Sequence, residues 1–195
     1  MLNTIKYFLK YTHNKTKRHG YRIIFENSRF VSYMPNCPLT GYFSSDDRTI
    51  HVAQYHPNWL SVLAHEYCHF EQQIDVNRKT NKDYIYEIID NWMEKKIELS
   101  KQKIQQYVRK IRDDELDCEK RAVALIQKFK LPINTIHYIQ KANLYLFFHI
   151  ILERHRVLLP SSLNPLWKKM PNHFNNNYDR IPRGLAEDFK KLLKS

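Results

Sequence analysis

The stretch of this chain with the greatest capacity for chemistry is the pentapeptide H-E-Y-C-H at residues 65–69. On a helix, His65 and His69 lie one turn apart on one face, so both imidazoles can reach a single metal ion. Glu66 then lies one position further round the helix, close enough to act on a metal-bound water without binding the metal itself. The H-E-x-x-H pattern therefore predicts a hydrolytic metal centre with Zn2+ as the metal.

The residues around the pentapeptide have the periodicity of an amphipathic helix. Pro57 suits the first position of such a helix. One apolar stripe at 3.6-residue spacing is formed by Leu60, Leu63, Tyr67, Phe70 and Ile74. At about 100° per residue, His65 and His69 fall roughly 150° from the middle of that stripe. The helix is therefore expected to pack on one side and to offer both imidazoles on another.

A zinc ion held by H-E-x-x-H needs a third protein ligand, which leaves a fourth position for water. On a helix through residues 114–125 and beyond, one stripe comprises Glu115, Glu119, Ala122, Ile126 and Phe129. Two carboxylates at the head of an apolar face are a conflict, because burying an unpaired charge is costly. A metal ion and a histidine N–H would resolve it, with Glu115 on the zinc and Glu119 on the far nitrogen of a ligand imidazole. The alternative is that both carboxylates are solvated in the first turn of their helix, where the macrodipole favours them.

These two motifs resemble those of a known enzyme class. H-E-x-x-H on one helix with E-x-x-x-[DE] on a later one is similar to the gluzincin class of zinc peptidases, the thermolysin-like arrangement. The segment from Glu115 to Ala122 resembles the E-x-x-A-D signature of the CAAX prenyl protease/HtpX group, and also the E-x-E-A segment of the ImmA/IrrE group of regulatory proteases. In those families the first Glu is the third zinc ligand and the acidic residue four positions later supports a His, which matches Glu115 and Glu119.

The resemblance implies a zincin-like fold and a zinc metallopeptidase that hydrolyses peptide bonds through a metal-activated water, with Glu66 as general base. It covers about residues 41–130 and departs from the family pattern at two positions. Cys118 stands where Ala is usual, and Glu119 stands where Asp is usual. For Cys118 we expect a small buried thiol packed between two helices, with thiolate ligation of the metal as the alternative.

The segment Thr49–Ala53 directly precedes the H-E-x-x-H helix. In zinc peptidases of this class an edge strand in that place pairs with the extended backbone of the substrate, and the resemblance suggests the same role here. The alternative is an ordinary hairpin strand.

The N-terminal third is rich in aromatic and β-branched residues and predicts a small antiparallel sheet. The expected strands are Tyr21–Glu26, Phe30–Met34, Gly41–Phe43 and Arg48–Ala53. Because the rest of the chain favours helix, the expected fold class is α+β, with the sheet followed by a predominantly helical body.

Residues 83–130 contain neither Pro nor Gly and therefore favour helix. One unbroken helix of that length would be unusual, so we expect a break near Ser100 or near Arg112-Asp113. A further helix is expected from about Asn134 to His155.

At 195 residues the chain is most simply a single domain. Within it we expect the sheet and the H-E-x-x-H helix at about residues 20–75, and a helical part with the third ligand at about 83–158. Residues 160–195 are expected to form a loop and then a short helix from Gly184 to Leu193.

The formal net charge of +12 suggests partners other than a peptide substrate. Such a field could attract nucleic acid, and a solvated helical face is the plainer explanation. The positive charge also supports an alternative function, in which the chain is a nucleic-acid-associated protein. That protein would be either a SprT-like DNA-associated protease, where a third downstream His completes the site, or a zincin-fold binding module without activity.

Features of the sequence favour a cytoplasmic protein. The first residues have no uninterrupted apolar stretch and no small-residue cleavage site, so no secretory signal is expected. The longest apolar run, residues 144–152, is too short to span a membrane as a helix. Three cysteines cannot all pair with one another, which suits a reducing compartment.

Overall fold

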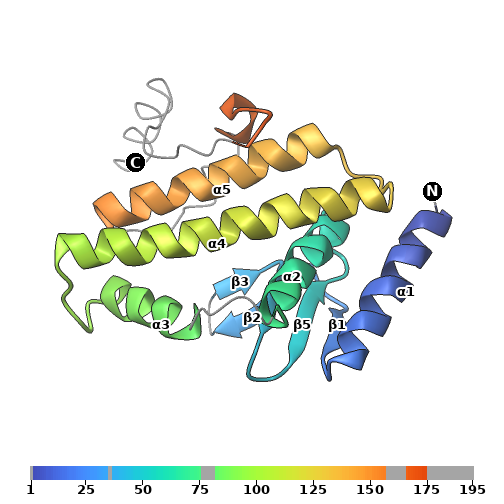
Figure 1. The fold of residues 1–195 in the computed structure, drawn as a ribbon, viewed down its shortest axis with the longest axis horizontal. Helices are drawn as coiled ribbons and strands as arrows, with labels where there is room; N and C mark the ends of the chain where they lie inside the picture. Colours follow the sequence, from blue (N-terminus) through green and yellow to red (C-terminus); the bar gives the residue numbers. More distant parts are fainter. Residues whose placement is uncertain (1, 35–36, 76–81, 157–165, 175–195) are drawn as a thin grey trace. The chain divides into compact units, whose positions relative to one another are not determined.

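The computed structural model describes residues 2–34, 37–75, 82–156 and 166–174. Within these residues lie five helices and five strands (Figure 1), which confirms the α+β class. The helices are α1 (Leu2–Arg18), α2 (Trp59–Gln73), α3 (Lys82–Met93), α4 (Lys101–Lys128) and α5 (Thr135–His155). The strands are β1 (Arg22–Glu26), β2 (Val31–Met34), β3 (Cys37–Leu39), β4 (Gly41–Ser44) and β5 (Thr49–Ala53). α1 has no counterpart among the elements that the sequence predicts.

The chain divides into two compact units, which we name the sheet unit and the helical unit. The sheet unit comprises Met1–Lys79 and Cys118–Ile133, and the helical unit comprises Thr80–Asp117 and Asn134–Ser195. Helix α4 begins in the helical unit and ends in the sheet unit. That the whole chain is a single domain stays a prediction.

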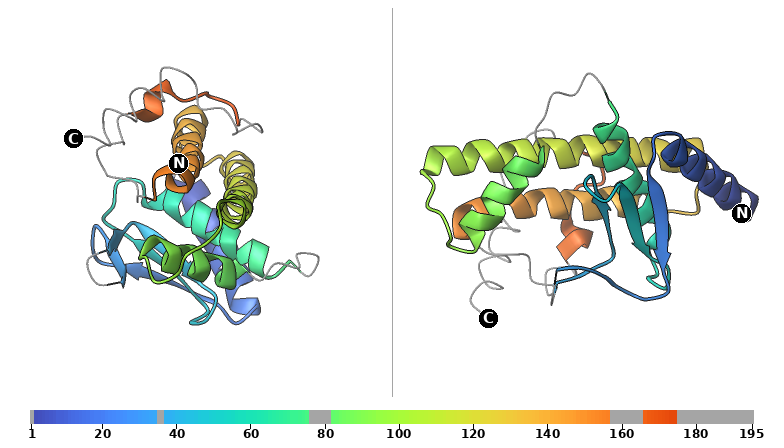
Figure 2. Two further views of the ribbon diagram at one scale, coloured as in Figure 1. Left: turned by 90° about the vertical axis from the view of Figure 1, so that its left-hand side faces the viewer. Right: turned by 90° about the horizontal axis from the view of Figure 1, so that it is seen from below.

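The larger sheet has the strand order β1-β5-β4 and is mixed (Figure 2). β1 pairs with β5 in parallel, from Arg22 opposite Thr49 to Glu26 opposite Ala53, whereas β4 pairs with β5 antiparallel. This corrects the expectation of an entirely antiparallel sheet. Parallel pairing needs a connection of a dozen or more residues, and residues 27–48, which include the separate β2–β3 pair, supply it.

β5 is the central strand of this sheet, so the expectation that Thr49–Ala53 forms a substrate-binding edge strand is wrong. Four of its five residues are buried and His51 is half-buried, as expected for a strand with a neighbour on each side. The edge strand that packs against α2 is β4. The sequence alone does not tell the edge strand from the central one, because a hairpin pattern does not indicate which of its two strands pairs with a third strand.

Helix α2 lies across one face of the sheet, against β4 and β5 (Figures 1 and 2). Leu60, Leu63, Tyr67 and Phe70 are buried, so the expected apolar stripe is confirmed at these positions. The helix begins at Trp59 with Asn58 as its N-cap residue, so its start lies two residues after Pro57.

Gly41 lets strand β4 come close to α2. A Cβ at this position would clash with the side chain of Val62 and lie 2.7 Å from the carbonyl oxygen of His51. It would also lie 3.4 Å from Cγ of Glu66. Glycine at this position therefore fixes the spacing between the edge strand and the stretch of helix that carries Glu66.

Helix α1 packs on α2 and on the C-terminal end of α4 within the sheet unit. The Phe8 ring is fully buried and lies 5.3 Å from the Phe129 ring, measured between centroids. Lys15 Nζ lies 2.7 Å from Glu71 Oε1 of α2. α1 is thus attached by one face, and its opposite face remains exposed.

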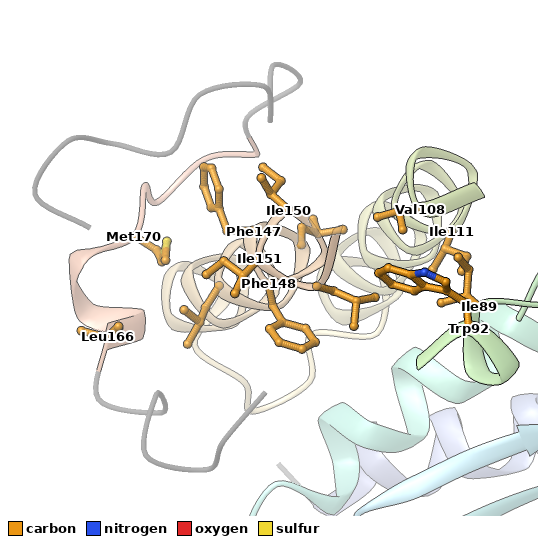
Figure 3. Close-up of a cluster of buried hydrophobic side chains, with 13 residues drawn as sticks. Ile89, Trp92, Val108, Ile111, Phe147, Phe148, Ile150, Ile151, Leu166 and Met170 are labelled. Atoms are coloured by element: carbon orange, nitrogen blue, oxygen red, sulfur yellow. The ribbon is translucent and has the colours of Figure 1, made fainter. Parts of the chain in front are cut away.

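The helical unit has its own apolar core (Figure 3). It includes Ile89 and Trp92 of α3, Val108 and Ile111 of α4, Phe147 and Ile151 of α5, and Leu166 and Met170 beyond α5. The expected break near Ser100 is confirmed, because α3 ends at Met93 and α4 begins at Lys101. The alternative break at Arg112-Asp113 is wrong, since α4 passes through it without interruption.

Two further expectations concern membranes and the C-terminal end. None of the helices in the described part of the chain combines the length and the hydropathy that crossing a membrane demands. The helix expected from Gly184 to Leu193 lies outside the described residues.

The stability of the helical unit should depend on pH through His149. This side chain is 5% exposed and lies near Glu115 and Arg112; burial, the largest cause, lowers its pKa below the ordinary value. Below about pH 6.5 the unfolded chain therefore binds a proton that the folded protein does not bind. The free energy of unfolding then falls by up to about 1.4 kcal/mol per pH unit. We expect His149→Gln to reduce the loss of stability between pH 7 and pH 5 in urea unfolding with EDTA present. The matched control His155→Gln, at an exposed position, should keep the wild-type slope.

Candidate metal centre

Helix α2 brings the two histidines of the H-E-x-x-H motif together. His65 and His69 are four residues apart, and their rings are nearly perpendicular with centroids 4.7 Å apart. The two Nε2 atoms face each other at 3.1 Å. Two ligands of a tetrahedral zinc ion, with Zn–N bonds of about 2.1 Å, lie about 3.4 Å from each other. The side chains are therefore spaced as two ligands of one ion are spaced.

The other ring nitrogen of each histidine faces an oxygen atom. His65 Nδ1 lies 3.3 Å from Glu119 Oε1, and His69 Nδ1 lies 3.2 Å from Gln72 Oε1. An amide oxygen and an ionised carboxylate can only accept, so the hydrogen bond of His69 with Gln72 and the ion-pair contact of His65 with Glu119 both favour a proton on Nδ1. With Nδ1 protonated, a neutral imidazole carries a lone pair on Nε2.

Two lone pairs that face each other at 3.1 Å repel unless a positive charge lies between them. That charge is either an extra proton shared by the two imidazoles or a metal ion bound to both. The arrangement of Nδ1 donors is the one that metal-binding histidines usually have, with the second ring N–H held by a carboxylate or carbonyl oxygen. His65 and His69 thus fit a metal ion.

Cys118 of α4 comes close to the opposite side of the His65 ring and is fully buried. Its Sγ lies 3.7 Å from His65 Nδ1 and 3.2 Å from the His65 carbonyl oxygen. One donor atom from each of His65, His69 and Cys118 lies within 4.8 Å of the others, so these residues form a group that could hold a metal ion. The sequence favours a packing thiol at this position, and the structure adds Cys118 as a candidate ligand.

Two arrangements of ligands compete for the His65 ring. If Nε2 of both histidines held the ion, His65 Nδ1 would keep its contact with Glu119 and Cys118 would stay a thiol. If His65 Nδ1 and Cys118 held the ion instead, Cys118 would be a thiolate ligand and Glu119 would lose its N–H partner. These contacts favour the first arrangement, because it places an acceptor oxygen near both Nδ1–H groups and lets the thiol donate to the His65 carbonyl.

Glu119 is buried in the middle of a long helix. It is 6% exposed, and its Oε2 atom is buried without a hydrogen-bond partner among the described residues. α4 begins at Lys101, so the alternative that this carboxylate is solvated in a first helical turn is wrong. Burying a carboxylate needs compensation, and His65 is the partner that lies within reach. That Glu119 orients His65 remains a prediction, and this distance supports it.

Glu115, the third ligand expected from the sequence, belongs to the helical unit. It is 3% exposed and accepts a hydrogen bond of 2.7 Å from the Tyr86 hydroxyl. Burial, followed by the charge of Glu115, raises the pKa of Tyr86, so the phenol stays protonated and donates. Along α4, Glu115 lies three residues before Cys118 and four before Glu119, on the same side of the helix. That Glu115 binds the metal stays a prediction.

Glu66, the expected general base, follows His65 on α2 and is half-buried. Its side chain lies beside the edge strand, where a Cβ on Gly41 would approach Glu66 Cγ to 3.4 Å. One step of about 100° round the helix separates it from His65. Glu66 therefore lies at the side of the histidine pair that faces β4.

Gln72 is a residue of the candidate centre for which the sequence predicts no role. It is 2% exposed, and its Oε1 lies 3.2 Å from His69 Nδ1. The signal was available in the sequence, because position i+3 on a helix places Gln72 next to His69. A glutamine is so common on helix surfaces that this spacing alone does not predict a role.

Removing the acceptor of Gln72 should weaken metal binding. We expect Gln72→Met to lower zinc affinity by about 10- to 100-fold, because the ring of His69 would lose the partner that fixes its Nδ1–H tautomer. Gln72→Glu, which keeps an acceptor, should retain wild-type affinity. The matched control is Gln73→Met, one residue further along α2 and exposed. Competition with a chromophoric chelator measures all four proteins, and equal affinities for Gln72→Met and Gln73→Met would contradict this role.

The chain matches no model of a known protein family, no curated protein and no solved structure.

Proposed function

We propose that the protein is a zinc-dependent metallopeptidase that hydrolyses peptide bonds. The observation that carries the proposal is the pair of Nε2 atoms 3.1 Å apart, each on a ring whose Nδ1 faces an oxygen acceptor. A pair so arranged fits a metal ion, and the Glu that follows the first His fits the general base of a hydrolase.

His65 and His69 would hold the ion together with Glu115 as third ligand. The position of Glu115 supports this choice, since it lies one turn before two residues of α4 that reach His65. Its carboxylate is buried, and the hydrogen bond from Tyr86 occupies Oε1. When bound, zinc supplies a Lewis acid that lowers the pKa of a water molecule to about 7.

The residues of the chain perform the remaining steps. Glu66 accepts a proton from the attacking water and then donates a proton to the leaving amine. Glu119 and Gln72 keep the two histidines in the tautomer that leaves Nε2 free to bind the metal. Each of these roles needs a side chain held in place, and the burial of Glu119 and Gln72 supplies that restraint.

A peptide suits this centre as substrate because of the strand beside it. β4 is an edge strand of the sheet in the described part of the chain, and it lies against the segment of α2 that carries Glu66. An edge strand presents unpaired backbone groups to which an extended peptide can add as a further strand. Such a peptide would pass close to Glu66.

The proposal is tested first by metal analysis and by hydrolysis. We expect one zinc ion per purified chain, hydrolysis of an unstructured protein such as casein, and loss of that hydrolysis on treatment with a chelator. His65→Ala should lose both zinc and activity, whereas the control His13→Ala, at an exposed position on α1, should keep both. Absence of bound zinc in the wild type, or equal zinc in the two variants, would overturn the proposal.

A second candidate function is a metal-binding module without hydrolytic activity. The observation that favours it is Cys118, which together with His65 and His69 offers a ligand set with a thiolate. Thiolate-containing sites are common among zinc centres that only stabilise a fold. In that case zinc would bind, chelation would lower the melting temperature, and no hydrolysis would be found.

A further inference from the structure

The exposed face of α1 carries a straight row of basic side chains. Lys6, Lys10, His13 and Lys17 are all exposed. At about 100° per residue, the four positions fall within an arc of about 60° on the helix surface. From Lys6 to Lys17 the row extends about 16 Å along the helix axis.

Among the described residues, no acidic side chain balances this row. The segment Leu2–Arg18 contains five Lys or Arg residues and neither Asp nor Glu. In the described part of the chain, Lys6, Lys10 and Lys17 form no ion pair. Lys15, on the inner side of the same helix, pairs with Glu71 at 2.7 Å. The fold therefore uses one lysine of α1 for packing and leaves the aligned ones in solvent.

The alignment is unfavourable for the helix by itself. Like charges at positions i and i+4, as in Lys6 and Lys10, destabilise a helix, and a cation near a helix N-terminus opposes the macrodipole. Packing of α1 does not require them, because its buried residues are Phe8, Thr12 and Thr16 on the other face. A feature that conflicts with local stability and serves no packing indicates a partner outside the helix.

A second row beside the first offers hydrogen-bonding and stacking groups. It consists of Asn3, Tyr7, Asn14 and Arg18, which are all exposed, with Tyr7 at 67%. The Tyr7 ring centroid lies 5.8 Å from that of Phe129, so one side of the Tyr7 ring contacts the body of the sheet unit. Lys128 Nζ lies 4.9 Å from the Tyr11 ring centroid and adds another cation on this side.

We propose that this face of α1 binds double-stranded nucleic acid through its phosphates, independently of the metal centre. A duplex carries about one negative charge per 1.7 Å of axis, so a row of about 16 Å meets several phosphates. An α-helix of this kind also fits the width of a major groove. An anionic membrane suits this face less well, because membrane-bound helices turn an apolar side to the lipid, whereas the apolar side of α1 is buried.

The basic residues of α4 lack this alignment and supply a control of equal charge. Lys101, Lys103 and Lys110 are exposed, but they are spread over about 180° of the helix surface. Replacing three lysines by glutamine lowers the net charge by the same amount in either helix. The comparison therefore separates the arrangement of charges from their number.

The test is fluorescence anisotropy with a labelled 20-base-pair DNA duplex at a series of salt concentrations. We expect the wild type to bind and its affinity to fall steeply with salt. The triple variant Lys6→Gln/Lys10→Gln/Lys17→Gln should bind at least tenfold more weakly at about 0.1 M salt, with a salt slope smaller by about 2 to 3. The control Lys101→Gln/Lys103→Gln/Lys110→Gln should change affinity less than threefold.

Three results would overturn the proposal: no binding by the wild type, equal losses in the two triple variants, or stronger binding to vesicles of anionic phospholipid than to the duplex. A third variant, Lys6→Arg/Lys10→Arg/Lys17→Arg, keeps the charges and should restore affinity. Failure of that rescue, with melting temperatures unchanged, would also contradict it. All the altered positions are exposed, so the variants should fold as the wild type does.

Discussion

Replacing Glu66 by Gln is expected to abolish peptide hydrolysis and to leave the bound zinc in place. The amide cannot accept a proton from the attacking water, and general-base catalysis accounts for about 10²- to 10⁴-fold in rate. The amide has nearly the same size as the carboxylate, so the packing of Glu66 beside Gly41 should persist. Turnover of a fluorogenic casein and the zinc content of the same preparation provide the two measurements.

The control for this variant is Glu71→Gln on the same helix. Glu71 faces Lys15 of α1 rather than the histidine pair, so its loss should affect stability and not turnover. Equal turnover in wild type and Glu66→Gln would exclude Glu66 as the general base. Loss of zinc from Glu66→Gln would instead make this residue a ligand.

Replacing the two candidate third ligands one at a time should remove zinc in one variant and leave it in the other. Glu115→Gln is expected to reduce zinc from one ion per chain to nearly none after dialysis, because an amide is a far weaker ligand than a carboxylate. The amide still offers an acceptor to the Tyr86 hydroxyl, so the helical unit should stay folded. Cys118→Ala should retain zinc, because in the favoured arrangement the thiol only donates to the His65 carbonyl. Elemental analysis and thermal unfolding provide the readouts.

The reverse pattern would select the other ligand set. If Cys118→Ala loses zinc and Glu115→Gln keeps it, the ion lies on the Nδ1 side of His65 and the metal-binding module becomes the better description. If both variants keep zinc, the ion is held by the two histidines and a ligand that neither the sequence nor the geometry identifies.

Short-range patterns predicted the elements of the fold well. The apolar residues of α2 recur with the period of an α-helix, and that period involves positions only a few residues apart. The burial of Leu63, Tyr67 and Phe70 could therefore be predicted from sequence. The same holds for the break before Lys101 and for Asn134, which caps α5 by accepting from the His137 N–H. α1 escaped prediction because its buried face is formed partly by Thr12 and Thr16, which carry no apolar signal.

Long-range relations were predicted less well, for a physical reason. Strand order depends on which segments pair after the chain has folded back, and β5 acquired β1 as a second neighbour across 22 intervening residues. Patterns in the local sequence do not predict that pairing. The edge strand beside α2 in the described residues is therefore β4, and not β5 as the resemblance implied.

For the candidate centre, the sequence by itself determined the pair of histidines and the adjacent glutamate, because four residues make one helical turn and the helix signal is strong. It also marked two carboxylates on an apolar stripe as a conflict that needs a partner. The spacing along α2 places Gln72 next to His69 as well. Only the tertiary structure decided that both Glu119 and Cys118 lie next to His65. Those contacts join α2 to a helix some fifty residues away, and their distances depend on how two helices pack, which no spacing along the chain encodes.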